Sequence, residues 1–330
     1  GAGVAESRSS APVDVPVDGP AVSVDLEVGP FPMAHRFSVL LLTAPPVLAP
    51  FRYRLAAQMD CRPVFRQNEI GYTHIGRTLL VYAGQGLGDT IQFCRYLPGL
   101  SAMGGRVVFE APPRLRRLLS SLPGVPAVIV PGESVPPADL VCPLMSIPAR
   151  AGAVVPVAPP YLFAEPDRVA RWRARIGTHG FRIGIAWQGN PGRTEDRGRS
   201  VRVREFAPLA AIPGVRLISL QKNDGTEQLE DGPAVETLGP DFDAGPDGFL
   251  DAAAAMMGVD LVVSSDTSIP HLAGALGRPV WMATRAVPDW RWLLDRADSP
   301  WYPTMRLFRQ TERDDGGPVF AAMAAAIRTT

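Results

Sequence analysis

The segment GQGLGDTIQF places a carboxylate directly behind a glycine-rich turn. Gly86 and Gly88, which flank Leu87 and follow Gln85, allow the backbone to turn tightly and to approach a ligand closely. A carboxylate on such a loop can act as a general base toward a hydroxyl group, the role we assign to Asp89. The alternative role is local: Asp89 caps the following helix, as in a capping box. Both roles can coexist at this residue.

A second elbow, LVVSSDTSIPHLAGALG, joins an apolar run to an alanine-rich helical segment. Free backbone N–H groups and the helix dipole at such a helix N-terminus attract an anion such as a phosphate group. His271 can donate to a diphosphate oxygen and stabilise it as a leaving group. The alternative is ordinary helix capping with a packed histidine. We predict an anion site that contains Ser264, Asp266, Thr267, Ser268 and His271.

Three further segments carry candidate polar residues, two of them at the carboxyl ends of expected strands and one early in an expected helix. The loop after RIGIAWQG contains Gln188, Asn190 and Arg193, which suit contacts to a sugar and a phosphate. Lys222 follows VRLISLQ, and Asp251 lies early in FLDAAAAMMG, where it could accept from a ribose hydroxyl. The alternatives are a solvated loop, a surface lysine and a helix cap. We assign all five residues to binding of a donor substrate.

The segment 288–310, PDWRWLLDRADSPWYPTMRLFRQ, concentrates aromatic side chains between charged ones. Such rings can stack on sugars or bases, but packing in a core or between domains is their commoner use. We therefore expect packing here, with Asp289 and Arg291 at the edge of the site.

The elements that must position these residues form two successive α/β units. Apolar runs alternate with helical segments in each unit, a pattern typical of parallel sheets. A proline-rich stretch, 152–160, separates the two units. Because ligands of doubly wound domains bind at the carboxyl ends of strands, the elbows should face one cleft. The expected strands lie within 78–83, 106–111, 127–130, 138–148, 182–189, 215–221, 234–239, 261–266 and 279–284.

Length and composition limit the function classes. A chain of 330 residues favours two domains, and 33 basic against 33 acidic residues give no net field toward nucleic acid or anionic lipid. The three cysteines lack metal-site spacing, so we predict neither zinc nor disulfides and a cytoplasmic location. No apolar run approaches the length of a membrane span. We interpret residues 1–34 as a disordered linker that begins with a vector-derived remnant.

Together these segments resemble the heptosyltransferase-like family of glycosyltransferases, the family-nine type with a GT-B fold. The resemblance is strongest to the glycosyltransferase domain associated with tetratricopeptide repeats in bacterial proteins, and it runs from about residue 78 to the C-terminus. The segments that carry it are LLVYAGQGLGDTIQFCRYLP, RIGIAWQGNP with DRGRS, RLISLQK, SDTSIPHLAGALGRPVW and PDWRWLLDRADSPWYPTMRLFRQ.

The resemblance implies two Rossmann-like doubly wound domains that face each other across a cleft. Residues 35–160 would form the acceptor domain and residues 161–330 the donor domain, with the final helix packed back on the first domain. The implied activity is inverting transfer of a sugar from a nucleotide sugar to a hydroxyl group, without a metal or cofactor. Asp89 would be the base, and the elbow at His271 would hold the donor phosphate. The implied acceptor is a protein, such as a flagellin, or a glycan.

Three other functions compete with this interpretation. A GT-B-type nucleotide-sugar epimerase would need further acid and base groups, for which Glu110, Glu133 and Asp139 are available. A catalytically degenerate binding module fits the lack of two residues usual in the family, a lysine in the loop after RIGIAW and an acidic residue at Gly84. An NAD-dependent enzyme is disfavoured because Asp89 stands at the third glycine of the dinucleotide fingerprint and would repel a pyrophosphate.

Overall fold

The computed structural model describes residues 76–125, 127–148, 159–192, 196, 198–312 and 316–329, together with two short strands nearer the N-terminus. These strands, β1 (Phe37–Ser38) and β2 (Gln58–Met59), pair antiparallel. The chain divides into two compact units, Gly1–Pro63 and Val64–Thr330, and the second unit holds everything described below. The linker that we expect at 1–34 lies outside the described residues, and the domain boundaries at 34 and 160 stay predictions.

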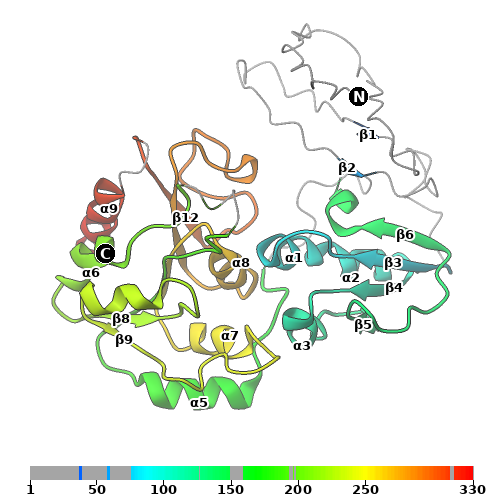
Figure 1. Ribbon diagram of the computed structural model, residues 1–330, viewed down its shortest axis with the longest axis horizontal. Helices are drawn as coiled ribbons and strands as arrows, with labels where there is room; N and C mark the ends of the chain where they lie inside the picture. Colours follow the sequence, from blue (N-terminus) through cyan, green and yellow to red (C-terminus); the bar gives the residue numbers. More distant parts are fainter. Residues whose placement is uncertain are drawn as a thin grey trace, which may run out of the picture. The chain divides into compact units, whose positions relative to one another are not determined.

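The first sheet of the larger unit is wholly parallel and has the strand order β5-β4-β3-β6 (Figure 1). Apolar side chains such as Val81 and Phe109 are fully buried in it. The helical stretch after the first strand is divided into three short pieces, with Pro98 in the first turn of the last one. The elements are β3 (Thr78–Tyr82), α1 (Leu87–Phe93), η2 (Cys94–Tyr96), α2 (Leu97–Ala102), β4 (Arg106–Glu110), η3 (Pro113–Leu115), α3 (Arg116–Leu119), β5 (Ala127–Ile129), β6 (Leu140–Pro143) and η4 (Leu144–Ser146).

The second sheet is also wholly parallel, with the order β12-β11-β10-β7-β8-β9. Numbered from β7 along the chain, this is the order 3-2-1-4-5-6 of a dinucleotide-binding Rossmann domain. Every residue of the central strand β10 is buried, as expected for a strand covered on both faces. The strands are β7 (Phe181–Ala186), β8 (Val215–Ser219), β9 (Val235–Glu236), β10 (Leu261–Ser265), β11 (Val280–Thr284) and β12 (Met305–Arg309).

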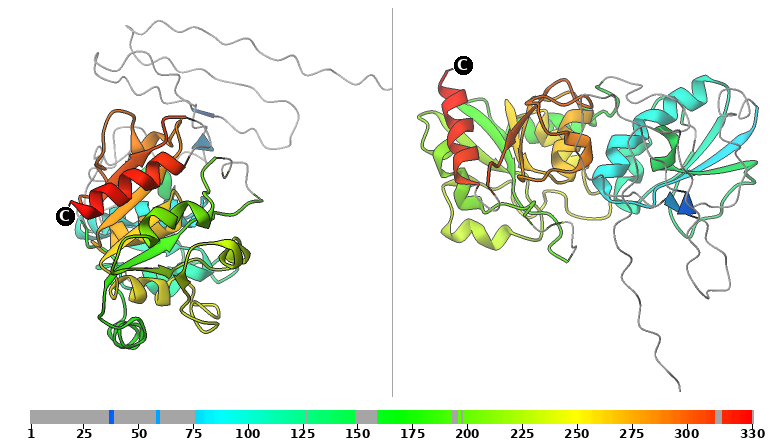
Figure 2. Two further views of the ribbon diagram at one scale, coloured as in Figure 1. Left: turned by 90° about the vertical axis from the view of Figure 1, so that its left-hand side faces the viewer. Right: turned by 90° about the horizontal axis from the view of Figure 1, so that it is seen from above.

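Helices cover this second sheet, and the last of them corrects one expectation. The final helix, α9, packs on α6 and β12 of the second sheet instead of returning to the first (Figure 2). Phe320 of α9 fixes this position because its ring lies 4.4 Å from that of Phe206 in the core. The helices are α5 (Pro166–Ile176), η6 (Val203–Phe206), α6 (Ala207–Ala210), η7 (Thr226–Asp231), α7 (Leu250–Met256), α8 (Ser268–Ala275), η8 (Trp290–Trp292) and α9 (Gly317–Arg328).

One continuous apolar core joins elements of both sheets. Helix α1, which follows the first sheet's β3, packs directly on α8, which follows the second sheet's β10. The buried Arg95 adds polar contacts, because it donates to the carbonyl of Trp301 at 2.8 Å and to the hydroxyl of Tyr161 at 2.9 Å. The two halves of the larger unit are therefore held together through side chains that water does not reach.

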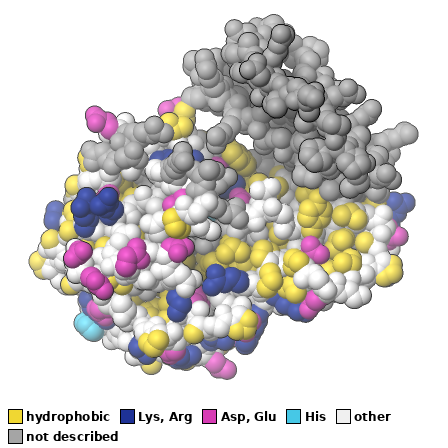
Figure 3. All heavy atoms as spheres, viewed as in Figure 1, with side chains coloured by type: hydrophobic (Ala, Val, Ile, Leu, Met, Phe, Trp, Pro, Cys, Tyr) yellow, Lys and Arg dark blue, Asp and Glu magenta, His cyan; other side chains and the backbone are white. Residues whose placement is uncertain are grey.

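The surface shows the charge balance of the composition. On the face seen in Figure 3, basic and acidic side chains intermingle rather than gather by sign. Within the described part of the chain, none of the helices has both the length and the apolar character needed to cross a membrane.

Candidate active site

The two elbows lie where the topology of each sheet predicts a ligand site. In the first sheet, β4 follows β3 on one side, and the later strand β6 pairs with β3 on the other side. In the second sheet, β8 follows β7 on one side, and the later strand β10 pairs with β7 on the other side. Open α/β sheets bind ligands at such switch points, outside the carboxyl ends of the strands. The glycine elbow follows β3 and the serine elbow follows β10, so both lie at these points.

The N-termini of α1 and α8 meet at Gly88 and His271. A Cβ atom placed on Gly88 would lie 2.9 Å from Cδ2 of His271 and 3.6 Å from Cα of Ser268. Any larger side chain would therefore push the imidazole away. This close approach brings together the proposed base loop and the proposed phosphate elbow, which the sequence separates by about 180 residues.

Asp89 is bound through both carboxylate oxygens. Oδ2 accepts from the backbone N–H of Gly86 at 3.0 Å, and Oδ1 accepts from Nη2 of Arg291 at 2.7 Å. The residue is the third of α1, so it caps the helix from inside instead of as the N-cap. Gln92 takes no part in this capping: among the described residues its buried side-chain amide has no hydrogen-bond partner. Each oxygen of Asp89 keeps a second lone pair for a further donor.

Arg291 is a buried cation among three carboxylates. Besides Asp89, its Nε lies 3.4 Å from Asp289 Oδ1, and Asp266 is close enough to act on it electrostatically. Burial alone would lower the pKa of this guanidinium, but Asp289, Asp89 and Asp266 outweigh that effect and raise the pKa. Arg291 therefore stays charged at every pH at which the protein works.

Asp266 lies directly before Thr267, the N-cap of α8, and is held by Trp292. Its Oδ2 accepts from the indole Nε1 of Trp292 at 2.9 Å, and its Oδ1 lies 3.9 Å from Nε2 of His271. Burial raises the pKa of this carboxyl group above its usual value, while the indole hydrogen bond and the nearby Arg291 oppose that shift. Asp266 thus holds its proton more tightly than an exposed aspartate does.

His271 is buried, and Tyr302 orients it. Nδ1 lies 3.0 Å from the hydroxyl oxygen of Tyr302, and the imidazole ring lies 5.3 Å from the ring of Trp292. Burial, followed by the positive charges of Arg291 and Arg95, lowers the pKa of His271 well below its usual value. The side chain is therefore a neutral imidazole, able to donate one hydrogen bond but carrying no positive charge.

The start of α8 is capped by a side chain. The Oγ1 of Thr267, the N-cap residue, accepts from the N–H of Ile269 at 3.3 Å, as the capping alternative requires. Ser264 and Ser265 are fully buried; Ser265 donates to the carbonyl of Trp187 at 3.0 Å and so joins β10 to the loop after β7. Ser268 opens the helix beside Gly88. The capping by Thr267 therefore leaves Ser268 next to Gly88, where α1 and α8 meet.

The loop after β7 is ordered by hydrogen bonds within it. Gln188 donates from Nε2 to Asp196 Oδ2 at 3.2 Å, and the side-chain oxygen of Asn190 accepts from the backbone of Gly192 at 2.9 Å. Gln221 accepts from the backbone N–H groups of Trp187 and Gln188 and joins the ends of β7 and β8. Gln188 also lines a polar hollow of about 520 Å³. Arg193 lies outside the described residues.

Lys222 and Asp251 are engaged inside the protein. Lys222 donates from Nζ to the carbonyl of Phe242 at 2.6 Å. Asp251 is buried and accepts from Arg168 at 2.7 Å and from the indole of Trp172 at 2.8 Å. These contacts give both residues a structural role, and their assignment to donor binding stays a prediction.

The sequence interpretation missed three partners of the site residues: Arg291 on Asp89, Trp292 on Asp266 and Tyr302 on His271. All belong to the aromatic segment that we expected mainly to pack. The sequence predicted Asp289 and Arg291 at the edge of the site but indicated no partner for either of them. Among the described residues, no three His, Cys, Asp or Glu side chains gather so as to hold a metal ion.

Comparison with known proteins gives one related sequence and several related folds. The chain is 30% identical over 176 residues to protein FlbA of Caulobacter vibrioides, a match that covers 51% of this chain but 29% of FlbA. The chain thus corresponds to less than a third of that relative. No family model matches the sequence.

Two solved glycosyltransferases share the fold. The family-nine glycosyl transferase of Veillonella parvula superimposes with a TM-score of 0.54 at 10% identity, covering 73% of this chain and 88% of that one. The ADP-heptose lipopolysaccharide heptosyltransferase II of Escherichia coli gives 0.51 at 15% identity, covering 76% and 99%. The expected fold class is therefore confirmed: this chain has the α/β architecture of two parallel sheets found in GT-B heptosyltransferase structures.

Proposed function

We propose that the protein is an inverting glycosyltransferase that moves a sugar from a nucleotide-sugar donor to an acceptor hydroxyl group. The observation that carries the proposal is the meeting of the two elbows. A carboxylate from the switch point of one sheet, Asp89, and a helix N-terminus with His271 from the switch point of the other lie at one place. The shared fold of two glycosyltransferases supports it.

The proposed reaction is a single displacement at the anomeric carbon. A bond forms between the acceptor oxygen and the anomeric carbon, the acceptor proton passes to Asp89, and the bond between the sugar and the phosphate breaks. The electron pair of that bond stays on the departing nucleotide phosphate. Inversion follows because attack and departure take place on opposite faces of the sugar, without a covalent intermediate on the protein.

The departing phosphate would lie at the N-terminus of α8. The helix dipole and the backbone N–H of Ser268 favour an anion there, although Ile269 already donates to Thr267 and Pro270 has no N–H. A neutral His271 can add one hydrogen bond. Donors already oriented toward a developing negative charge stabilise it without reorganisation. Adenine is the first base to test, since the related Escherichia coli enzyme is named for ADP-heptose.

The remaining expectations belong to this proposal. The acceptor is a protein or a glycan, with a flagellin as a protein example, and the transfer needs no metal ion. A cytoplasmic location and an association with tetratricopeptide repeats stay predictions. Gln188 and Asn190 would face the sugar of the donor from the loop after β7.

The epimerase alternative gains no support from the positions of two of its candidate acids. Glu133 is paired with Arg116, and Asp139 accepts from the backbone N–H of Thr78, at the amino end of β3 and away from the elbows. Conversion of a nucleotide sugar to its epimer without any acceptor would nevertheless favour that alternative.

The test is calorimetric titration with ADP, UDP, GDP, dTDP and CMP of the wild type, His271→Ala, Asp89→Asn and Asp139→Asn. We expect one nucleotide to bind, His271→Ala to weaken it about tenfold or more, and the two aspartate variants to bind normally. Transfer with the matching donor should fall by about 10²- to 10⁴-fold in Asp89→Asn and stay normal in Asp139→Asn. A wild-type protein that binds no nucleotide would refute the proposal.

A further inference from the structure

We propose that the segment Asp289–Tyr302, the positioning segment, orients the three polar side chains of the site. The inference rests on the proposed function and deepens it. One side chain of the segment contacts each site residue: Arg291 contacts Asp89, Trp292 contacts Asp266, and Tyr302 contacts His271. The segment follows β11 of the second sheet, yet it reaches the base loop of the first.

The contact of Arg291 is the most specific of the three. It joins residues 202 positions apart in the sequence at 2.7 Å, and the guanidinium is nine-tenths buried. A buried arginine is stable only where carboxylates neutralise it, and Asp289 supplies a second one at 3.4 Å. The pair fixes Oδ1 of Asp89, while the backbone of Gly86 fixes Oδ2. Asp89 is thereby held in one rotamer.

Trp292 and Tyr302 orient the two residues of the proposed phosphate site, Asp266 and His271. Trp292 donates its indole N–H to Asp266, the residue before the N-cap of α8, and Tyr302 contacts Nδ1 of His271. A hydrogen bond on one ring nitrogen fixes the orientation of an imidazole and the role of its other nitrogen. Because Nε2 is the atom near Gly88 and Asp266, Tyr302 controls the face of His271 turned toward the site.

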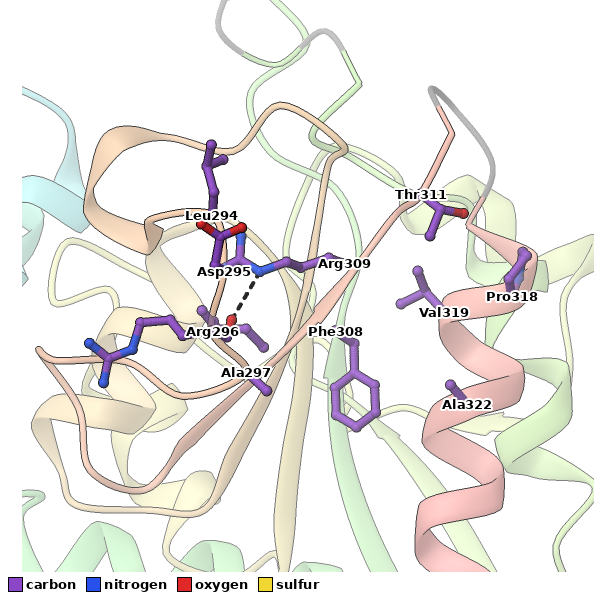
Figure 4. Close-up of a pocket in the computed structure, with 11 residues that line it drawn as sticks. Leu294, Asp295, Arg296, Ala297, Phe308, Arg309, Thr311, Pro318, Val319 and Ala322 are labelled. Atoms are coloured by element: carbon purple, nitrogen blue, oxygen red, sulfur yellow. Dashed lines mark hydrogen bonds between the residues drawn. The ribbon is translucent and has the colours of Figure 1, made fainter. Parts of the chain in front are cut away.

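The positioning segment is itself held rigidly. Asp289 caps η8 by accepting from the N–H of Arg291, and the indole of Trp301 donates to the carbonyl of Arg291 at 3.0 Å. From β12, Arg309 donates to the carbonyls of Trp292 and Arg296; the second bond is dashed in Figure 4. The strand therefore fixes the backbone from which the three contacting side chains extend.

Packing alone does not account for this arrangement. Packing would require apolar contact, whereas each of the three side chains directs a polar atom at a polar atom of a different site residue. The structure therefore assigns Arg291, Trp292 and Tyr302 to positioning: they act through Asp89, Asp266 and His271 and need no contact with the substrates.

Double-mutant cycles test this assignment in the full-length protein. Arg291→Gln should lower kcat about 10- to 100-fold with little change in the KM of the donor, because one hydrogen bond to a charged group is lost. In an Asp89→Asn background, which has already lost the base, the same change should lower kcat by less than about twofold. Tyr302→Phe should weaken nucleotide binding in the wild type but not in His271→Ala.

Two controls separate positioning from general damage. Arg296→Gln removes an arginine of the same segment that pairs with Asp298 in a more exposed place, and Trp281→Phe trims an aromatic ring packed on Phe308. Both should keep wild-type kcat and KM. If Arg291→Gln does not fold, Arg291→Lys keeps the charge but loses the planar fork, and the same cycle is measured with it.

The inference would be overturned if Arg291→Gln lowered kcat by the same factor in Asp89→Asn as in the wild type. Wild-type kcat in a folded Arg291→Gln would also overturn it. Failure of the proposed function gives a different result, in which the wild type neither binds a nucleotide nor transfers a sugar. If only the positioning assignment fails, the wild type is active and the free-energy effects of the paired substitutions are additive.

Discussion

His271 has a very different environment in the folded protein and in the unfolded chain. In the folded protein it lies between Gly88, Trp292 and Tyr302, where burial keeps the imidazole neutral. In the unfolded chain the same side chain takes up a proton once the pH falls below its ordinary pKa. The difference between the two states makes protein stability depend on pH.

The sign follows from proton counting. Below the ordinary pKa of 6.5, His271 binds a proton in the unfolded chain but not in the folded protein. Acidification therefore lowers the free energy of unfolding, by at most about 1.4 kcal/mol per pH unit. Full stability from this residue is present above that pKa. We predict that the free energy of unfolding falls less steeply from about pH 7.5 to about pH 5.5 in His271→Gln than in the wild type.

Urea unfolding at the two pH values measures the slopes. His179→Gln is the control, because it removes an exposed histidine that lies outside the site. Asp266, whose pKa burial raises, acts in the opposite sense at lower pH, and this contribution is common to the variants compared. Equal slopes for His271→Gln and the wild type would contradict the prediction.

At the scale of elements, α8 depends on close approach to its neighbours. Gly274 lies on this helix, and a Cβ atom placed there would be 2.4 Å from Cδ1 of Tyr302. The tyrosine ring thus rests directly on the helix backbone, which brings its hydroxyl within reach of His271. Glycine is needed at position 274 because the ring leaves no room for a Cβ atom.

We predict that Gly274→Ala destabilises the protein by about 1–3 kcal/mol through overpacking and weakens nucleotide binding by displacing Tyr302. Gly99→Ala is the matched control, since Gly99 lies in α2 and a Cβ atom there would meet nothing within 4 Å. That change should be neutral or stabilise by up to about 1 kcal/mol. Thermal unfolding measures the stability, and calorimetric titration measures the nucleotide affinity. Wild-type stability and affinity in Gly274→Ala would contradict the prediction and show that the helix can shift to make room for the methyl group.

The elements that sequence reasoning predicted well are those with local signals. Apolar runs predicted the strands of both sheets except β12, which lies in the aromatic segment and was not expected as a strand. The glycine and serine elbows predicted both switch points, because turn residues act on their immediate neighbours in the chain. The contact of Arg291 with Asp89 has no such signal, since it depends on how two halves of the chain pack. The same holds for α9, whose position depends on the packing of Phe320 against Phe206, and for Asp251, whose partners come from α5.

At the scale of the whole molecule, the shared core makes the two sheets of the larger unit interdependent. Apolar residues of both belong to one cluster, and Arg95 connects η2 to Tyr161 and Trp301. Such a core favours a single cooperative unfolding transition over separate melting of two halves. Two probes already present report on the halves separately.

All six tryptophans lie between Trp172 and Trp301, so their emission follows the second sheet. Cys94 follows the first, since it is buried after α1 and burial raises the pKa of its thiol to about 12. We predict that Cys94 resists alkylation in the native protein and becomes reactive at the same urea concentration at which the emission changes. Peptide mass spectrometry identifies the labelled cysteine, and separate midpoints would indicate two independently folding halves.

The contact between Trp292 and Asp266 also gives the protein a built-in optical reporter. The indole that donates to this carboxyl group lies 5.3 Å from the ring of His271, so its emission depends on the electric field at the start of α8. An anion that arrives there changes the field at the ring. Ligand occupancy can therefore be followed as a change in fluorescence in unlabelled protein, with Trp292→Phe as the silent reference.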